Sequence, residues 1–252
     1  MLDLSKNKNL GDNLAKTAAQ LRLRAEHLLA EQSRNDPRQR VLIALAGVPG
    51  SGKSTVATAL LEDLNRHGIR HVAVLPMRFT ILTIMLLQDE FHYSRHVLSS
   101  FNDPALAFRR RGAPFTFDAT GFLEIVVKLK QMPVTGCGKH AMIIRAPSFD
   151  HAEMDPVPNR IYLSSEARLV IIEGNYTLLN EAPWDQIADL VDDKWFVDVA
   201  EDMAHLRLAA RHLKAGIENI MELALLRADE NDVPNGAYIR KNLVEPNVRI
   251  IN

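Results

Sequence analysis

Gly-Val-Pro-Gly-Ser-Gly-Lys-Ser-Thr, residues 47–55, matches the phosphate-binding pattern G-x-x-x-x-G-K-[ST]. Its glycines let the backbone turn tightly and bring N–H groups close to phosphate oxygens. Lys53 would place a positive charge on the β- and γ-phosphates, and the Ser54 hydroxyl would ligate Mg²⁺. The stretch therefore predicts an ATP-Mg²⁺ site formed by Gly47, Pro49, Gly50, Ser51, Gly52, Lys53, Ser54 and Thr55.

The sequence on both sides of this loop has the expected pattern. Residues 41–46 are a continuous apolar run, which is typical of a buried parallel strand. Apolar residues then recur at helical spacing from Val56 to Leu64, and Gly68 offers a stop. A strand, a glycine-rich loop and a helix are the context that a P-loop requires, whereas a chance glycine-rich turn would lack it.

Length and composition are those of one globular α/β domain with additions. The chain has 252 residues, of which 47% are hydrophobic and 24% charged. The formal net charge of −1 argues against a global basic field that would recruit nucleic acid. The single cysteine, Cys137, excludes an internal disulfide, and no Cys/His set has zinc-ligand spacing.

The N-terminus predicts a helical extension over residues 1–37. Leucine and alanine recur at helical spacing between Leu14 and Leu29, and Asp36-Pro37 would end the helix. We expect this helix to pack on a domain formed by residues 38–252. A membrane-surface role is the weaker interpretation, because Glu26 and Glu31 dilute its basic face. The N-terminus also lacks an apolar signal core, so we expect a cytoplasmic protein without a membrane partner.

Apolar strand candidates alternate with helical stretches along the chain. The predicted strands are 41–46, 71–76, 141–145, 169–172 and 195–199, and the predicted helices are 53–67, 118–131, 201–214 and 217–229. This alternation predicts a P-loop NTPase fold: a five-stranded parallel sheet with helices on both faces. Ligands on such sheets bind at the carboxyl ends of the strands, where the sequence places polar residues.

Residues 78–88 interrupt this order with a second apolar run. The run separates strand candidate 71–76 from Asp89 and is too short for a membrane span of roughly 20 residues. Its simplest interpretation is an extra buried helix or strand.

Several motifs in a fixed order resemble the uridine kinase/phosphoribulokinase/pantothenate kinase group of P-loop kinases, in particular its fungal and bacterial members. The matching pieces are Gly47–Thr55, Asp89–Arg95, Arg110–Ala119, Pro147–Ala152 with Asp155-Pro156, Ile172–Tyr176, Arg207–His212, and Arg227 with Asn231-Asp232 and Asn235. In relatives the second strand usually runs directly into an Asp-Gly-Phe-His stretch. Here 78–88 intervene and Glu90 replaces the glycine. We therefore interpret 78–88 as a lineage-specific insertion or a translated intron, which sequencing of the transcript would distinguish.

The resemblance implies transfer of the γ-phosphate of ATP to a hydroxyl group, and a helical lid. It implies that Asp89 takes or orients the proton of the acceptor hydroxyl, and the alternative is a loop aspartate that caps a helix. Glu173 follows an apolar strand at the place of a Walker B acid and would bind Mg²⁺ with Ser54; otherwise it faces solvent. Arg207 and Arg211 are four apart on a predicted helix and would reach the phosphates from the lid, unless they belong to a solvated face. We rank Arg211 with Lys53 and Asp89 as catalytic and Arg207 as nucleotide-binding.

The acceptor site is predicted from loops after the other strands. The candidates are Arg111, Asp150, His151 and Tyr176, each of which could equally have a structural role. The acceptor is a small molecule such as a nucleoside, a sugar or a vitamin-like alcohol, and the sequence leaves a homodimer open. The alternatives are a regulatory P-loop NTPase, an ATP-binding pseudokinase without turnover, and a nucleic-acid motor; balanced charge counts against the last.

Overall fold

The computed structural model describes residues 4–69, 83–136, 140–150 and 153–252. Its centre is a five-stranded sheet in the order β2-β5-β1-β6-β7, in which every neighbouring pair is parallel. The strands are β1 Val41–Gly47, β2 Thr83–Leu87, β5 Leu169–Glu173, β6 Asp193–Asp198 and β7 Val248–Ile251. The predicted five-stranded parallel sheet is confirmed.

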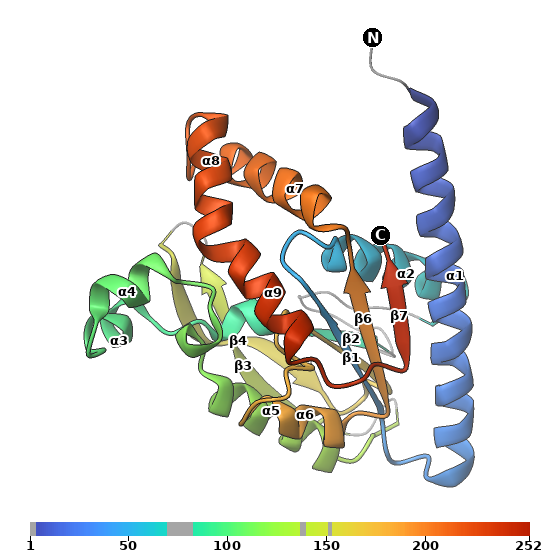
Figure 1. Cartoon of the computed structure of the whole chain (residues 1–252). Coiled ribbons are helices and arrows are strands. Elements are labelled where there is room, and N and C mark those ends of the chain that lie inside the picture. The colour runs from blue at the N-terminus through green and yellow to red at the C-terminus, as the bar shows by residue number, and fades with distance from the viewer. Residues whose placement is uncertain (1–3, 70–82, 137–139, 151–152) are drawn as a thin grey trace.

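Helices cover both faces of the sheet (Figure 1). α1 Leu4–Asn35 and α2 Lys53–Arg66 lie on one face, and α5 Ala119–Gln131 and α6 Asp185–Leu190 on the other. All residues of β1 and β5 are buried, which explains why 41–46 and 169–172 are continuous apolar runs without alternation. The side chains of these strands divide between two apolar clusters, one on each face.

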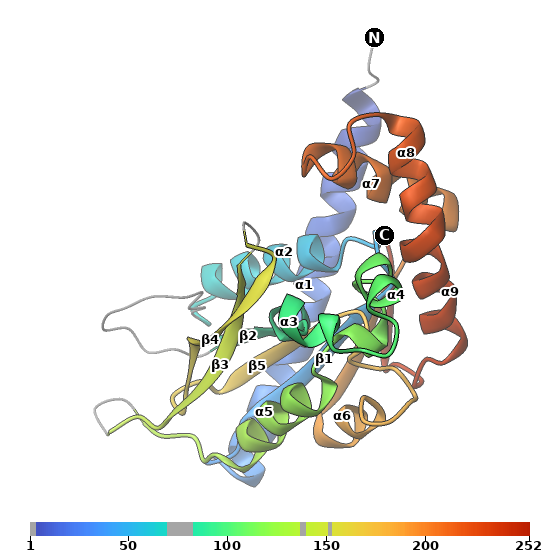
Figure 2. The ribbon, with the colours of Figure 1, turned by 90° about the vertical axis from the view of Figure 1, so that its left-hand side faces the viewer.

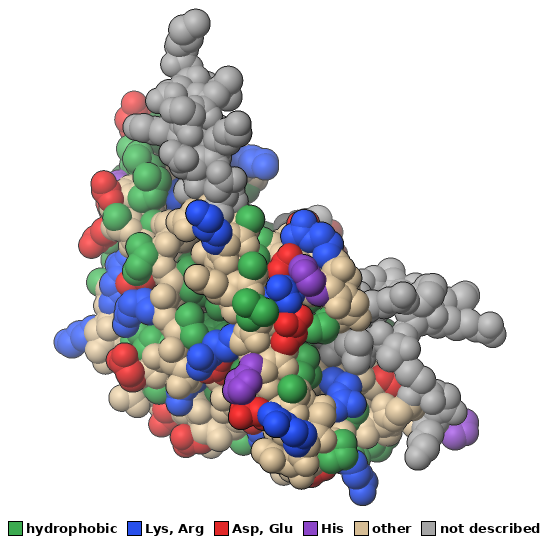
Figure 3. All heavy atoms as spheres, turned by 90° about the vertical axis from the view of Figure 1, so that its right-hand side faces the viewer, with side chains coloured by type: hydrophobic (Ala, Val, Ile, Leu, Met, Phe, Trp, Pro, Cys, Tyr) green, Lys and Arg blue, Asp and Glu red, His purple; other side chains and the backbone are tan. Residues whose placement is uncertain are grey.

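The predicted N-terminal helix is confirmed as α1, and buried Leu21 and Ala25 pack it on α2 and the sheet. Arg24 donates two hydrogen bonds to the buried carboxylate of Asp193 in β6, which also accepts one from the Trp195 indole at 2.7 Å. The face around α1 mixes acidic and basic side chains without a broad area of one sign among its described residues (Figure 3). Within the described ranges, no helix is long and apolar enough to cross a membrane.

The edge strand β2 comes from the second apolar run, 78–88. Candidate strand 71–76 lies outside the described residues, and the strand that pairs with β5 is Thr83–Leu87. Residues 83–87 of the presumed insertion are therefore part of the sheet. This agrees with the interpretation of 78–88 as an extra buried helix or strand.

The third predicted strand is also placed differently. β3 Ile143–Asp150 pairs antiparallel with β4 Asp155–Ser164 in a separate two-stranded sheet, which stands apart from the central sheet in Figure 2. The fifth parallel strand is instead β7, a four-residue edge strand that sequence reasoning missed.

Shorter helices surround the carboxyl edge of the sheet. They are η1 Gln88–Phe91, α3 Arg95–Ser99, α4 Pro104–Arg109, η2 Pro114–Thr116, α7 Glu201–Lys214, α8 Met221–Arg227, the π-helical turn η3 Ala228–Asp232 and α9 Val233–Lys241. Helices α7 and α8 rise above the sheet as the predicted helical lid (Figure 1). Predicted helix 217–229 is confirmed only in part, since α8 begins at Met221 and passes into η3.

Candidate active site

The loop between β1 and α2 has the backbone geometry of an anion site. Gly50 and Gly52 have φ values of 75° and 84°, in the left-handed region that favours glycine. A Cβ on Gly47 would lie 2.4 Å from the Val197 carbonyl oxygen, so only glycine fits there. The Ser51 hydroxyl is buried without a hydrogen-bond partner in the described chain. Helix α2 begins directly after this turn, so the loop and the helix N-terminus fit the phosphates of a nucleotide.

Lys53 projects from the first turn of α2 and is 9% exposed. Its Nζ donates to Asn175 Oδ1 at 2.5 Å and to the Val48 carbonyl at 3.3 Å. Burial lowers the pKa of Lys53, while the charges of Glu173 and Asp89 act in the opposite direction. The ammonium is therefore buried and feels the charges of two carboxylates, and in such a poorly solvated place it would interact strongly with phosphate.

Glu173 ends β5 and is also 9% exposed. Burial raises the pKa of its carboxyl, and the charge of Asp89 adds to the rise. The charge of Lys53 and a hydrogen bond with Ser54 act against that rise. Ser54 and Glu173, the two predicted metal ligands, thus lie on the same side of the site, and their hydroxyl and carboxylate oxygens suit Mg²⁺.

Strand register brings Asp89 to the same edge. Leu45 in β1 and Leu87 in β2 both pair with Glu173 in β5, so the three strands end at one level. Asp89 follows β2 in η1, and its side chain is exposed. Its charge affects the pKa of both Lys53 and Glu173, which places the predicted proton acceptor close to them.

Gln88, which the sequence did not single out, joins the loops that carry Asp89 and Glu173. Its side chain is fully buried, and its Oε1 accepts a hydrogen bond from the Tyr176 N–H at 2.8 Å. A Cβ on Gly174 would lie 2.2 Å from this Oε1 and 2.4 Å from Gln88 Cβ, so glycine permits the contact. Gln88 Nε2 has no partner in the described chain.

Glu90, the departure from the usual glycine, also has a structural partner. Its carboxylate accepts a hydrogen bond from the Phe149 N–H, which ties η1 to β3. His92 continues this contact, because its ring lies 4.0 Å from that of Phe117 and 5.1 Å from that of Phe149, centroid to centroid. The β3–β4 hairpin is thereby held against the segment that carries Asp89.

Arg111 borders the same region. Its guanidinium donates to the Tyr93 carbonyl at 3.0 Å, lies 3.9 Å from Asp155 and stacks 5.3 Å from the centroid of the Phe149 ring. Burial lowers its pKa. Arg111 and the rings beside it form a polar and aromatic wall near Asp89, which suits the predicted contact with an acceptor.

Two other acceptor candidates, Tyr176 and Asp150, make contacts within the protein. The fourth candidate, His151, lies outside the described residues. Tyr176 is fully buried and its hydroxyl donates to the Gly112 carbonyl at 2.6 Å, so it holds the turn after Arg111 rather than facing an acceptor. Burial also raises its pKa. Asp150 accepts from the Glu153 N–H at 3.2 Å across the hairpin turn.

The lid arginines lie on α7. Arg207 donates to the Gly50 carbonyl at 3.5 Å, and thus contacts the P-loop backbone. Arg211 is 63% exposed and lies 3.8 Å from Asp232 in η3, and its charge contributes to the lowered pKa of Lys53. His212 is buried and pairs with Asp232 at 2.9 Å, so its ring is engaged within the protein.

Three asparagines that sequence reasoning left without a role support the site. Asn252 donates to the Ser51 carbonyl at 2.7 Å, and Asn231 and Asn235 donate to the Arg111 and Gly112 carbonyls at 2.9 and 3.4 Å. Asn231 and Asn235 belonged to the resemblance, which gave them no role. Nothing in the sequence signals Asn252, because its contact spans 201 positions.

The family model for the Phosphoribulokinase / Uridine kinase family matches residues 42–229. The chain is 40% identical over 226 residues to a Schizosaccharomyces pombe protein named "Putative uridine kinase C227.14", covering 89% of this chain and 86% of that protein. It is 40% identical over 154 residues to the "ATP-dependent kinase-like protein notR'" of Aspergillus versicolor, covering 61% of this chain and 87% of that protein.

Solved structures show the same fold. A "putative fructose transport system kinase" from Silicibacter sp. TM1040 has a TM-score of 0.72 and 28% identity, covering 91% of this chain and 98% of that one. YFH7 from Saccharomyces cerevisiae has a TM-score of 0.77 and 23% identity, covering 93% and 99%. The chain belongs to the phosphoribulokinase/uridine kinase family of P-loop kinases.

Proposed function

We propose that this protein transfers the γ-phosphate of ATP to a hydroxyl group of a small molecule, with Mg²⁺ as cofactor. The observation that carries the proposal is the meeting of Lys53, Glu173 and Asp89 at one sheet edge, where each affects the pKa of another. Phosphoryl transfer depends on positioning and charge neutralisation, which such a constellation supplies.

The residues divide into two groups. Lys53, the P-loop N–H groups and Arg211 would neutralise and orient the phosphates, while Ser54 and Glu173 would hold Mg²⁺. ATP supplies the phosphoryl group when bound, and Mg²⁺ spreads the charge that develops on it. Arg207 supports the loop through the Gly50 carbonyl and would add its charge to the phosphate site.

Asp89 would act on the acceptor. Its carboxylate accepts the proton as the acceptor oxygen forms its bond to γ-phosphorus, and the bond from phosphorus to the β,γ-bridging oxygen breaks. The products are ADP and a phosphate monoester. Because Asp89 is exposed and follows β2 directly, a bound acceptor would reach it from solvent.

A panel assay tests this function and its alternatives. The protein is incubated with ATP-Mg²⁺ and nucleosides, sugars, glycerate, pantothenate or sugar phosphates, and ADP release is measured. Acceptor-dependent release supports a kinase, release without acceptor indicates a regulatory NTPase, and nucleotide binding without release indicates a pseudokinase. Asp89→Asn should lower kcat by about 10²- to 10⁴-fold with little change in ATP affinity. Near-normal turnover of this variant would remove Asp89 from its proposed role.

A further inference from the structure

The Lys53 ammonium is directed by a side chain to which the sequence assigned no role. Its Nζ donates to Asn175 Oδ1 at 2.5 Å and to the Val48 carbonyl at 3.3 Å. A lysine ammonium has three N–H donors and no acceptor, so Asn175 must present its amide oxygen to Lys53 rather than its nitrogen. Across the described residues Nζ makes only these two hydrogen bonds, which leaves one donor for a phosphate oxygen.

The backbone on both sides of Asn175 is fixed by hydrogen bonds. The Gly174 N–H donates to the Leu45 carbonyl of β1 at 3.1 Å, and the Tyr176 N–H donates to Gln88 Oε1 at 2.8 Å. One contact comes from the end of β1 and the other from the segment that follows β2. Asn175 is therefore held where these strands end, and its amide oxygen is offered from a rigid support.

The partner that gives Lys53 its direction is uncharged. Burial lowers the pKa of Lys53, and the charges of Glu173 and Asp89 act against this. Asn175 adds a hydrogen-bond acceptor to this environment without adding a third negative charge. An acid in its place would pair with the ammonium and would repel the phosphates that the ammonium is expected to bind.

We propose that Asn175 is a positioning residue for phosphoryl transfer: it directs the Lys53 ammonium at the phosphates of ATP and leaves its charge available to them. A charge that is already oriented needs no rearrangement during the transfer. This inference rests on the proposed function, because the phosphates concerned are those of that reaction. Asn175 acts on the nucleotide through Lys53, so its charge and its hydrogen bond should have separable effects.

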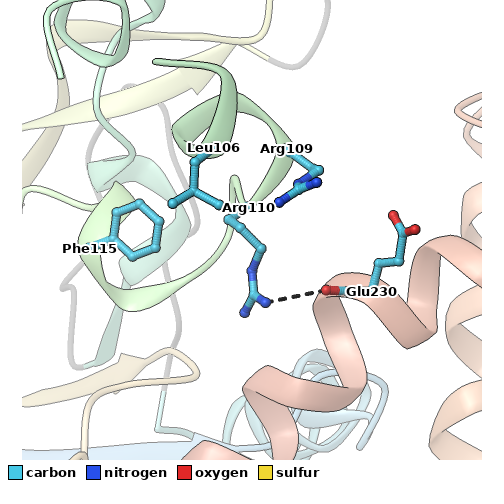
Figure 4. A pocket seen from close by; sticks show the side chains of 5 residues that line it. All are labelled: Leu106, Arg109, Arg110, Phe115 and Glu230. Carbon is cyan, nitrogen blue, oxygen red and sulfur yellow. Dashed lines mark hydrogen bonds between the residues drawn. The ribbon is translucent and has the colours of Figure 1, made fainter. Parts of the chain in front are cut away.

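A cleft outside the site provides a control for charge. It lies between α4 and η3, has a volume of about 450 Å³ and is lined by Leu106, Arg109, Arg110, Phe115 and Glu230. In Figure 4 Arg110 reaches η3, where it donates to the Glu230 carbonyl at 3.3 Å. None of these lining residues belongs to the proposed site, and Arg109 is exposed. Arg109→Gln therefore changes the net charge as Asn175→Asp does, but away from Lys53. Asn180→Asp, at an exposed asparagine further along the loop after β5, is a second such control.

Two substitutions at Asn175 separate positioning from stability. Nucleotide-free Asn175→Asp should have a higher Tm than Asn175→Ala, because aspartate keeps the hydrogen bond to the buried ammonium. Affinity for a nonhydrolysable ATP analogue with Mg²⁺, measured by calorimetry, should run in the opposite order. We expect it to fall about 3- to 10-fold in Asn175→Ala and more than about tenfold in Asn175→Asp. With the best acceptor of the panel, Asn175→Ala should also lower kcat at saturating ATP by about tenfold.

A merely structural residue would give the same order in both measurements, since the less stable variant would also bind less tightly. A loss of affinity in Asn175→Asp no larger than in Asn175→Ala would therefore overturn the proposal, as would a lower Tm of Asn175→Asp. The two control variants should keep the affinity within about twofold of the wild type, and a loss as large as that of Asn175→Asp would assign the effect to net charge. If no acceptor is phosphorylated, the kinase function fails, and the binding measurements, which need no acceptor, still decide the role of Asn175.

Discussion

Gln88→Leu should reduce both stability and turnover, because Gln88 joins the two loops that carry Asp89 and Glu173. Leucine has a similar volume, so the close contact with Gly174 would be largely kept. The Tyr176 N–H, however, would lose the acceptor that lies 2.8 Å away in a fully buried place. An orphaned buried donor costs about 1–3 kcal/mol.

The expected cost lies in the lower part of that range. Gln88 Nε2 is itself buried without a partner in the described chain, and its removal recovers part of the free energy. A net loss of about 1–2 kcal/mol corresponds to a Tm decrease of roughly 2–8 °C for a chain of this size. A shift of η1 by about 1 Å would displace Asp89, and such misplacement can cost on the order of 10²-fold in rate. KM for ATP should stay within about twofold, because Gln88 makes no contact with the P-loop among its hydrogen bonds in the described residues.

The assay compares Gln88→Leu with Gln186→Leu, an exposed glutamine on α6. Tm is followed by scanning calorimetry, and kcat and KM by ADP release with the best acceptor from the panel. Equal Tm and kcat in the two variants would refute the role of Gln88. A lower Tm with unchanged kcat would show that the contact stabilises the fold without aligning Asp89.

Three further perturbations test other parts of the structure. Asp193→Ala leaves the buried Trp195 indole without its acceptor and frees Arg24 of α1, so the free energy of unfolding in urea should fall by about 1–3 kcal/mol; an unchanged value would contradict the anchoring of α1. Burial raises the pKa of Glu173, so its stabilising contribution is complete below the ordinary carboxyl pKa and is lost as pH rises through the raised value. As the pH rises from 5 to 8, the Tm of the nucleotide-free wild type should therefore fall relative to that of Glu173→Gln. The opposite trend would argue against the buried charge. Asn252→Ala removes the hydrogen bond to the P-loop carbonyl of Ser51 and should weaken binding of a fluorescent ATP analogue by about 2- to 10-fold; unchanged affinity would make that contact incidental.

The sequence predicted the parts of the fold that depend on local pattern. The P-loop, its flanking strand and helix, and the strand that ends at Glu173 are each signalled by neighbouring residues, and the structure contains all of them. The errors concern pairing between distant segments. The apolar run 141–145 has the composition of a core strand, but β3 pairs with β4, whose polar and proline-containing sequence gave no strand signal.

The supporting residues of the site were harder to predict for the same reason. Gln88 contacts Tyr176 across 88 positions of the chain. The sequence also does not distinguish a buried tyrosine from an exposed one: Tyr176 is fully buried, whereas Tyr238 is exposed. An aromatic residue after a strand fits an acceptor wall as well as a core, and only its burial decides between them.

The turn at Arg111 and Gly112 has one further consequence. Its carbonyls accept hydrogen bonds from Asn231 at the lid base, from Asn235 and from Tyr176, while Asp232 in the same π-helical turn pairs with His212 of the lid. If α7 moves when a nucleotide binds, these contacts would transmit the movement to the turn at Arg111. By thermodynamic linkage, any increase that bound ATP then gave to the affinity for the acceptor would be matched by an equal increase that the acceptor gave to the affinity for ATP.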